Sequence, residues 1–149
     1  MKNFLVYLLL LISPCTSLSA PPIFHSTLRG GLECIDRLDP EFYVNSFRRW
    51  FGISGSLENG AIHFKVTETL YNSPVEELYV SVPAPLHVRP IFIAAVFSSS
   101  RQSLQEALST YPGLKFIDGA KFGYSFNFTQ SGVRIYELNG KAIMMCIIQ

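Results

Sequence analysis

The segment GVRIYELNGKAIMMCII, residues 132–148, decides the fold. It contains Asn139 and Gly140, a dipeptide typical of the two-residue turn of a β-hairpin, because such turns need a positive φ at both positions. Closing the hairpin predicts three cross-strand pairs, namely Leu138 with Lys141, Tyr136 with Ile143, and Val133 with Cys146. Residues 142–148 are apolar on both faces, so we expect this strand in the centre of a sheet.

Segments upstream of the hairpin predict further strands. Residues 61–70 and 121–129 alternate apolar and polar side chains, which is typical of strands with one buried face. In the first of these segments, Phe64 is expected to face the core and His63 to point into solvent. The alternation resumes over 78–82, after a turn in which the glutamates at 76 and 77 are expected to be solvated.

The remaining strand-like segments differ in character. Residues 91–97 form a continuous apolar run, which indicates a strand buried on both faces. Three prolines in 83–90 exclude a central position in a sheet, so we expect an edge or a linking stretch there. The chain is expected to begin with an extended segment over 21–35, interrupted by Gly30 and Gly31.

Two amphipathic helices are predicted. For the first, Asp39 is a capping residue, Pro40 fits the first turn, and Gly52 marks the end. One arc of that helix carries the apolar side chains Tyr43, Val44, Phe47, Trp50 and Phe51. The second helix is expected at about 100–111, with Ser99 and Gln102 as a capping box. Its apolar stripe consists of Leu104, Ala107, Leu108 and Tyr111.

This order of elements predicts the α+β class: a curved antiparallel sheet with two amphipathic helices packed on one face. A sheet closed into a barrel or cone is an alternative, because its aromatic strand faces would then line an interior. The length is that of one domain, which we place at residues 20–149.

The first 19 residues have the pattern of a secretory signal peptide. Lys2 precedes an apolar run over 4–12, and small residues follow before the expected cut after Ser19. Nine residues make about 14 Å of helix, too short for a stable membrane span. Cleavage removes Cys15 and leaves Cys34 and Cys146, which we expect to form a disulfide in an oxidising compartment. We therefore expect a secreted, extracellular protein.

Charge and motif content exclude several classes of function. The chain has 12 Lys and Arg and 11 Asp and Glu, and loss of Lys2 with the leader leaves 11 of each, a net charge of zero. A neutral chain without a basic run is a poor ligand for nucleic acid. The three histidines, His25, His63 and His87, lack metal-ligand spacing, and no nucleophile motif or cofactor-binding loop is visible. We expect no metal, no cofactor and no enzymatic activity.

Two features of 121–129 bear on function. Asn127-Phe128-Thr129 is an N-glycosylation sequon on the polar face of the strand, so we expect a glycan at Asn127 in eukaryotic material. The other face is aromatic, and an interior lined by these side chains and Phe64 is one way to hold an apolar ligand; the candidate lining is Phe64, Phe122, Tyr124, Phe126 and Phe128.

The sequence therefore leads to two hypotheses about function. The first is a secreted, disulfide-linked, non-enzymatic binding module that acts on an extracellular protein partner, since 13% of the residues are aromatic and aromatic side chains anchor protein interfaces. The second is an extracellular carrier of a small apolar ligand in a sheet-lined cavity. A filled core explains the same aromatic residues without a ligand.

Overall fold

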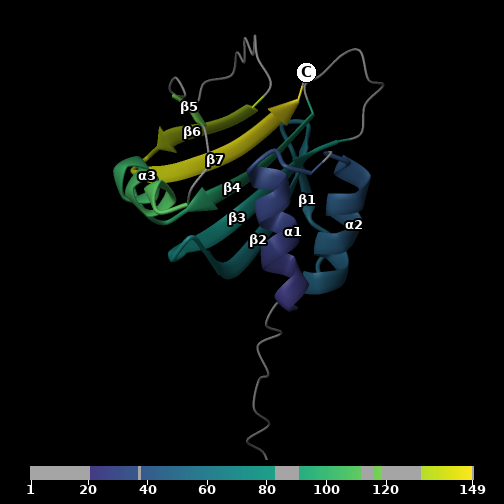
Figure 1. The fold of residues 1–149 in the computed structure, drawn as a ribbon. Helices are drawn as coiled ribbons and strands as arrows, with labels where there is room; N and C mark the ends of the chain where they lie inside the picture. Colours follow the sequence, from purple (N-terminus) through teal and green to yellow (C-terminus); the bar gives the residue numbers. More distant parts are fainter. Residues whose placement is uncertain (1–20, 37, 83–90, 112–115, 119–131, 149) are drawn as a thin grey trace, which may run out of the picture.

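The strands in the part of the chain that the structure describes form one seven-stranded sheet, in the order β1-β2-β3-β4-β7-β6-β5. The computed structural model describes residues 21–36, 38–82, 91–111, 116–118 and 132–148. The elements within them are α1 (Pro22–Leu32), α2 (Pro40–Phe51), β1 (Ser56–Glu58), β2 (Ala61–Leu70), β3 (Ser73–Ser81), β4 (Ile91–Phe97), α3 (Arg101–Ser109), β5 (Phe116–Asp118), β6 (Gly132–Leu138) and β7 (Lys141–Ile148) (Figure 1). Neighbouring strands are antiparallel except β5, which pairs in parallel with β6. The α+β class is confirmed.

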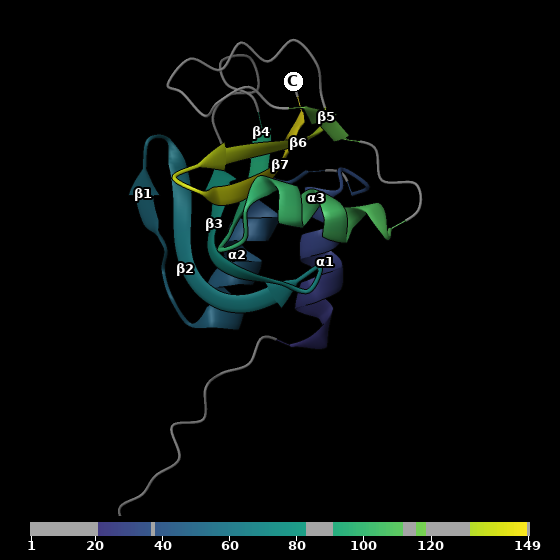
Figure 2. The same cartoon turned by 90° about the vertical axis from the view of Figure 1, so that its left-hand side faces the viewer.

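The C-terminal hairpin forms with the predicted register. Leu138 pairs with Lys141, Tyr136 with Ile143, and Val133 with Cys146. β7 lies between β4 and β6, and the side chains of residues 142–147 are all buried. Figure 2 shows β1 and β5 at opposite ends of the sheet. The central position predicted for the apolar strand is confirmed.

The first described element differs from the prediction. Residues 21–35 do not form an extended segment, because Pro22–Leu32 is a helix. Phe24, Leu28 and Leu32 follow one another at intervals of four residues, and all three are fully buried. The glycines do not interrupt this helix: a Cβ on Gly31 would lie 2.7 Å from the hydroxyl oxygen of Tyr43, so glycine is needed there for close packing against α2.

Helix α2 is as predicted. The carboxylate of Asp39 accepts hydrogen bonds from the backbone N–H groups of Glu41 and Phe42, at 3.0 and 3.3 Å. The helix ends at Phe51 and is capped by Gly52, which has a left-handed φ of 65°. The predicted apolar arc faces the core, with Tyr43, Val44 and Phe47 buried and Trp50 and Phe51 half-buried against it.

Helix α3 begins and ends elsewhere than predicted. Ser100, not Ser99, caps it, and the Ser100 hydroxyl accepts a hydrogen bond from the backbone N–H of Ser103. The helix ends at Ser109, and its buried residues are Leu104 and Leu108. With α1, the described part of the chain holds three helices rather than the two predicted.

The buried side chains of the described residues form two clusters. The larger cluster contains side chains of all three helices and strand residues such as Phe64 and Met144. The smaller cluster consists of Ala94, Val96, Tyr136, Ile143, Met145 and Ile147, with Tyr79 and Phe92 packed against it. Its members on β4 and β7 alternate with residues of the larger cluster and so lie on the other face of the sheet. Among the described residues, the smaller cluster contains strand side chains and no helix side chain.

A disulfide joins Cys34, just after α1, to Cys146 in β7, with 5.4 Å between the two Cα atoms. Several sequence predictions concern residues outside the described ranges: the leader at 1–19, the linking stretch 83–90, and the strand 121–129 with its sequon. No described helix is both long enough and apolar enough to cross a bilayer.

Candidate functional site

One row of residues crosses six strands on the face that carries the smaller cluster. The backbone register sets Ser56 beside His63, His63 beside Tyr79, Tyr79 beside Ala94, Ala94 beside Met145, and Met145 beside Arg134. Residues that face each other across a sheet in this way project to the same side. The row therefore begins with polar and aromatic side chains at β1–β3 and continues into small and apolar ones at β4 and β7.

A hollow of about 520 Å³ lies over this row. Its floor is mainly apolar and includes Ala61, Tyr79, Phe92, Ala94, Val96, Ile143 and Met145. Its walls are mainly polar and consist of Glu58, Asn59, Glu77, Leu138, Asn139 and Lys141. Two turns therefore contribute to the walls, the β1–β2 turn through Asn59 and the β6–β7 turn through Leu138 and Asn139.

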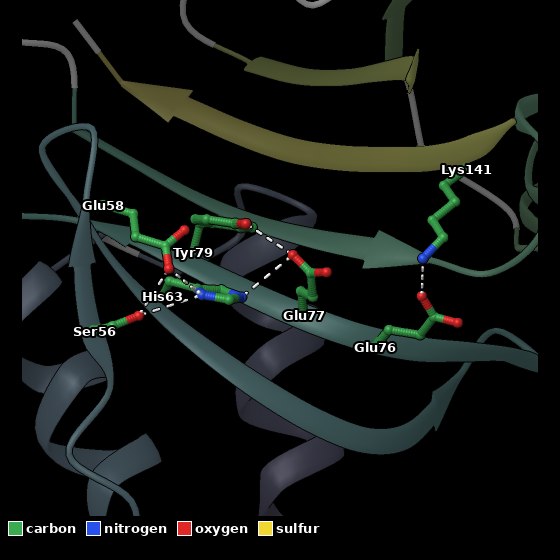
Figure 3. Close-up of polar contacts among 7 residues, drawn as sticks. All are labelled: Ser56, Glu58, His63, Glu76, Glu77, Tyr79 and Lys141. Carbon is green, nitrogen blue, oxygen red and sulfur yellow. Dashed lines mark hydrogen bonds and ion pairs between the residues drawn. The ribbon is translucent and has the colours of Figure 1, made fainter. Parts of the chain in front are cut away.

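A buried histidine lies beside the hollow, between two glutamates (Figure 3). His63 is 6% exposed, so the prediction that it points into solvent is wrong. Its Nδ1 is 3.1 Å from Oε1 of Glu58, and its Nε2 is 3.2 Å from Oε2 of Glu77. The imidazole is stacked on the ring of Tyr79, with 4.6 Å between ring centroids. Side chains of the neighbouring strands thus cover the outward face of β2 at His63.

The two carboxylates are held in different ways. Glu58 accepts a hydrogen bond of 3.0 Å from the Ser56 hydroxyl, and this bond, followed by that with His63, lowers the pKa of Glu58. Glu77 accepts a hydrogen bond of 2.8 Å from the Tyr79 hydroxyl. Burial, followed by this bond to Glu77, raises the pKa of Tyr79, so its phenol stays protonated. His63 Nε2 is close to Glu77 but is not aligned for a hydrogen bond.

An ion pair stands at another wall of the hollow. Lys141 of β7 donates to Oε2 of Glu76 on β3, and this bond raises the pKa of Lys141 (Figure 3). Glu76 and Glu77 therefore lie in a strand, and the predicted solvated turn at these residues is wrong. A bulge in the β3–β4 pairing between Val75 and Glu77 takes in Glu76.

Glu58 and Glu77 lie on opposite sides of the His63 ring. Within the described ranges, no group of three His, Cys, Asp or Glu side chains is arranged to hold a metal ion. Glu58 and Glu77 contact opposite nitrogens of the His63 ring and so do not converge on one point with it. The residues that line the hollow include both glutamates and Tyr79 but not the imidazole. The site can therefore offer a ligand two carboxylates beside an apolar floor.

The candidate ligand-lining residues proposed from sequence do not coincide with the described residues that line the hollow. Phe64 is fully buried in the larger cluster, with its ring 5.5 Å from that of Phe47, and it does not line the hollow. The other four candidate lining residues, Phe122, Tyr124, Phe126 and Phe128, and the sequon at Asn127 lie outside the described ranges. Sequence reasoning missed Glu58, Glu77 and Tyr79, because only the pairing of β1, β2 and β3 places them around His63.

Comparison with known proteins gives no relative. The chain matches no protein-family model, no curated protein and no solved structure.

Proposed function

We propose that this protein is a secreted, non-enzymatic binding module, and that a protein partner docks over the hollow on the sheet. The observation that carries the proposal is the hollow itself, with its apolar floor and polar walls. Tyr79, Phe92 and Met145 line it, and Tyr, Phe and Met are enriched in protein interfaces. An apolar centre with a polar margin is also the usual arrangement of an interface.

We also propose that the helices leave the face of the sheet with the hollow free for the partner. The three helices cover one face of a curved sheet, and the opposite face receives the partner. In support, side chains of all three helices share one cluster with Phe64, whereas the cluster beneath the hollow consists of strand side chains. Export by the leader, the Cys34–Cys146 disulfide and a glycan at Asn127 belong to the same proposal.

Site-specific photocrosslinking tests the docking face. A photoreactive amino acid replaces Leu138, which lines the hollow and is 43% exposed. The matched control places it at Asn45, an exposed residue of α2. Extracellular fluid from the source supplies the partner. We expect one protein to be crosslinked from position 138 and not from position 45. Equal crosslinking from both positions, or none from 138, would overturn the proposal.

A second candidate is the carrier of a small apolar ligand. It is favoured by the volume of the hollow, since sites for small molecules occupy about 300–1,000 Å³. The lining would then be the floor residues, not Phe64. Native mass spectrometry before and after organic extraction distinguishes this candidate, because a carrier loses mass on extraction. An unchanged mass and melting temperature, with no uptake of an apolar fluorescent probe, would exclude it.

A further inference from the structure

Acidic side chains outnumber basic ones among the charged residues that line the hollow. Glu58, Glu77 and Lys141 are its charged lining residues, and Lys141 is already paired with Glu76. Lys65, which pairs with Glu77 in the β2–β3 register, is a further cation near the carboxylates of Glu58 and Glu77. Within the described part of the chain, the ion pairs of Glu58 and Glu77 are both made with His63.

The imidazole of His63 is hydrogen-bonded to only one of the two carboxylates. Glu58 is bonded to Nδ1, whereas Nε2 is close to Glu77 but is not aligned for a hydrogen bond. Beside an apolar floor, a carboxylate attracts a cation more strongly than it would in bulk water. A cation that enters the hollow would form ion pairs with both carboxylates and would give Glu77 a further partner.

Both carboxylates are within reach of a ligand. The side chain of Glu58 is 47% exposed and that of Glu77 is 30% exposed, whereas His63 between them is 6% exposed. The apolar floor next to them is suited to the aliphatic part of a long side chain, since such stems pack on apolar surface while the charged end stays at polar groups.

We propose that the protein partner inserts an arginine side chain, with its stem on the floor beside Tyr79 and its guanidinium between Glu58 and Glu77. This inference rests on the proposed function and specifies the chemistry of the partner. Arginine fits better than lysine because its five N–H donors form a planar fork that can serve two carboxylates, whereas the lysine ammonium is a point charge.

The first experiment needs no partner. N-acetyl-arginine amide is titrated into the full mature protein, and NMR follows the methyl groups of Ala94 and Met145 on the floor. The citrulline analogue is the matched ligand control, because it has nearly the same shape and no charge. We expect shifts of both methyl groups with arginine and roughly tenfold weaker binding of citrulline, since hydrogen bonds to charged groups are the stronger ones.

Variants of the protein test which carboxylates bind the guanidinium. Glu58→Gln and Glu77→Gln should each weaken arginine binding severalfold. Glu41→Gln, at an exposed residue in the first turn of α2, is the matched control and should not change it. Equal binding of arginine and citrulline, or unchanged binding to both hollow variants, would overturn the inference. The ligand comparison uses the unaltered protein and so does not depend on how the variants fold.

The partner itself provides a separate test. The peptide crosslinked from position 138 should contain an arginine, and replacing that arginine by glutamine in the partner should abolish the crosslink. A crosslinked peptide without a basic residue would refute the arginine and leave the protein-binding function intact. Arginine amide that binds in the hollow while no protein is crosslinked would refute the partner and indicate a free small guanidinium or amine ligand.

Discussion

The two glycines at the end of α1 should respond in opposite ways to the same substitution. Alanine is favoured over glycine in a helix by about 0.8–1.0 kcal/mol. At Gly30, the added Cβ would meet Oδ2 of Asp36 at 2.0 Å. Asp36 is exposed, so its side chain can turn away at little cost. Gly30→Ala should therefore increase the free energy of unfolding by about 0.5–1 kcal/mol.

At Gly31 the obstacle is a buried ring. The Cβ would lie 2.7, 2.8 and 3.0 Å from Oη, Cζ and Cε1 of Tyr43, whose side chain is 2% exposed. Ordinary contacts at such atoms are 3.4 Å or longer, so the ring and the packing around it must shift by about half an ångström. Overpacking of this kind costs about 1–3 kcal/mol, which exceeds the gain in helix propensity. Gly31→Ala should lower the free energy of unfolding by roughly 1–2 kcal/mol.

Urea unfolding measures both variants. Trp50 is the single tryptophan of the chain and packs against the core, so its fluorescence reports the transition. We expect the two variants to differ by about 2 kcal/mol in the free energy of unfolding, with wild type between them. Equal effects of both substitutions would refute the packing of Gly31 against Tyr43. Strong destabilisation by both would refute a helix that extends to Leu32.

Three further predictions concern the disulfide, the buried phenol of Tyr43 and the glycan. Reduction of the Cys34–Cys146 bond should lower the free energy of unfolding by about 5 kcal/mol in the chain-entropy treatment, because the two cysteines are 112 positions apart. Urea unfolding with and without reductant measures this change, and a change below about 1 kcal/mol would contradict the prediction. Burial, followed by the charge of Asp36, raises the pKa of Tyr43 to about 12. Since the unfolded phenol titrates near 10, the stability from this group is complete below about pH 10 and is lost as the pH rises towards 12. Tyr43→Phe should therefore reduce the fall in the free energy of unfolding between about pH 10 and 12. An unchanged dependence of stability on pH would argue against a raised pKa of Tyr43. Enzymatic removal of oligosaccharide should increase the electrophoretic mobility of wild-type protein from a eukaryotic source and leave the mobility of the Asn127→Gln variant unchanged. Equal mobility of the wild type before and after treatment would exclude a glycan at Asn127.

Elements whose ends are marked by characteristic turn or capping residues could be predicted from sequence. The Asn-Gly turn fixes the register of the β6–β7 hairpin, and Asp39 and Gly52 mark both ends of α2. A glycine pair gives no such signal. Gly30 and Gly31 have the composition of a turn, and only the proximity of Tyr43 shows that the second is required inside a helix. The spacing of Phe24, Leu28 and Leu32 was the stronger indication of helix α1.

The candidate site could not be predicted, because its parts come together through strand pairing. His63 has the alternation of a solvent-facing residue, and its burial depends on Glu58 from β1 and Glu77 from β3. Alternation identifies which side chains share a face of one strand, but not what the neighbouring strands place beside them. The row from Ser56 to Met145 becomes visible only when the register of five strands is known.

The central position of β7 has a consequence for the synthesis of the chain. β4 and Cys34 leave the ribosome before their partners, β7 and Cys146, have been made. At about 5–20 residues per second, the 112 residues added after Cys34, up to and including Cys146, take roughly 6–22 s to synthesise. For part of that interval β4 lacks its β7 neighbour, and throughout it Cys34 lacks its native partner. Neighbouring nascent chains can therefore pair or crosslink with each other in ways that the finished molecule prevents.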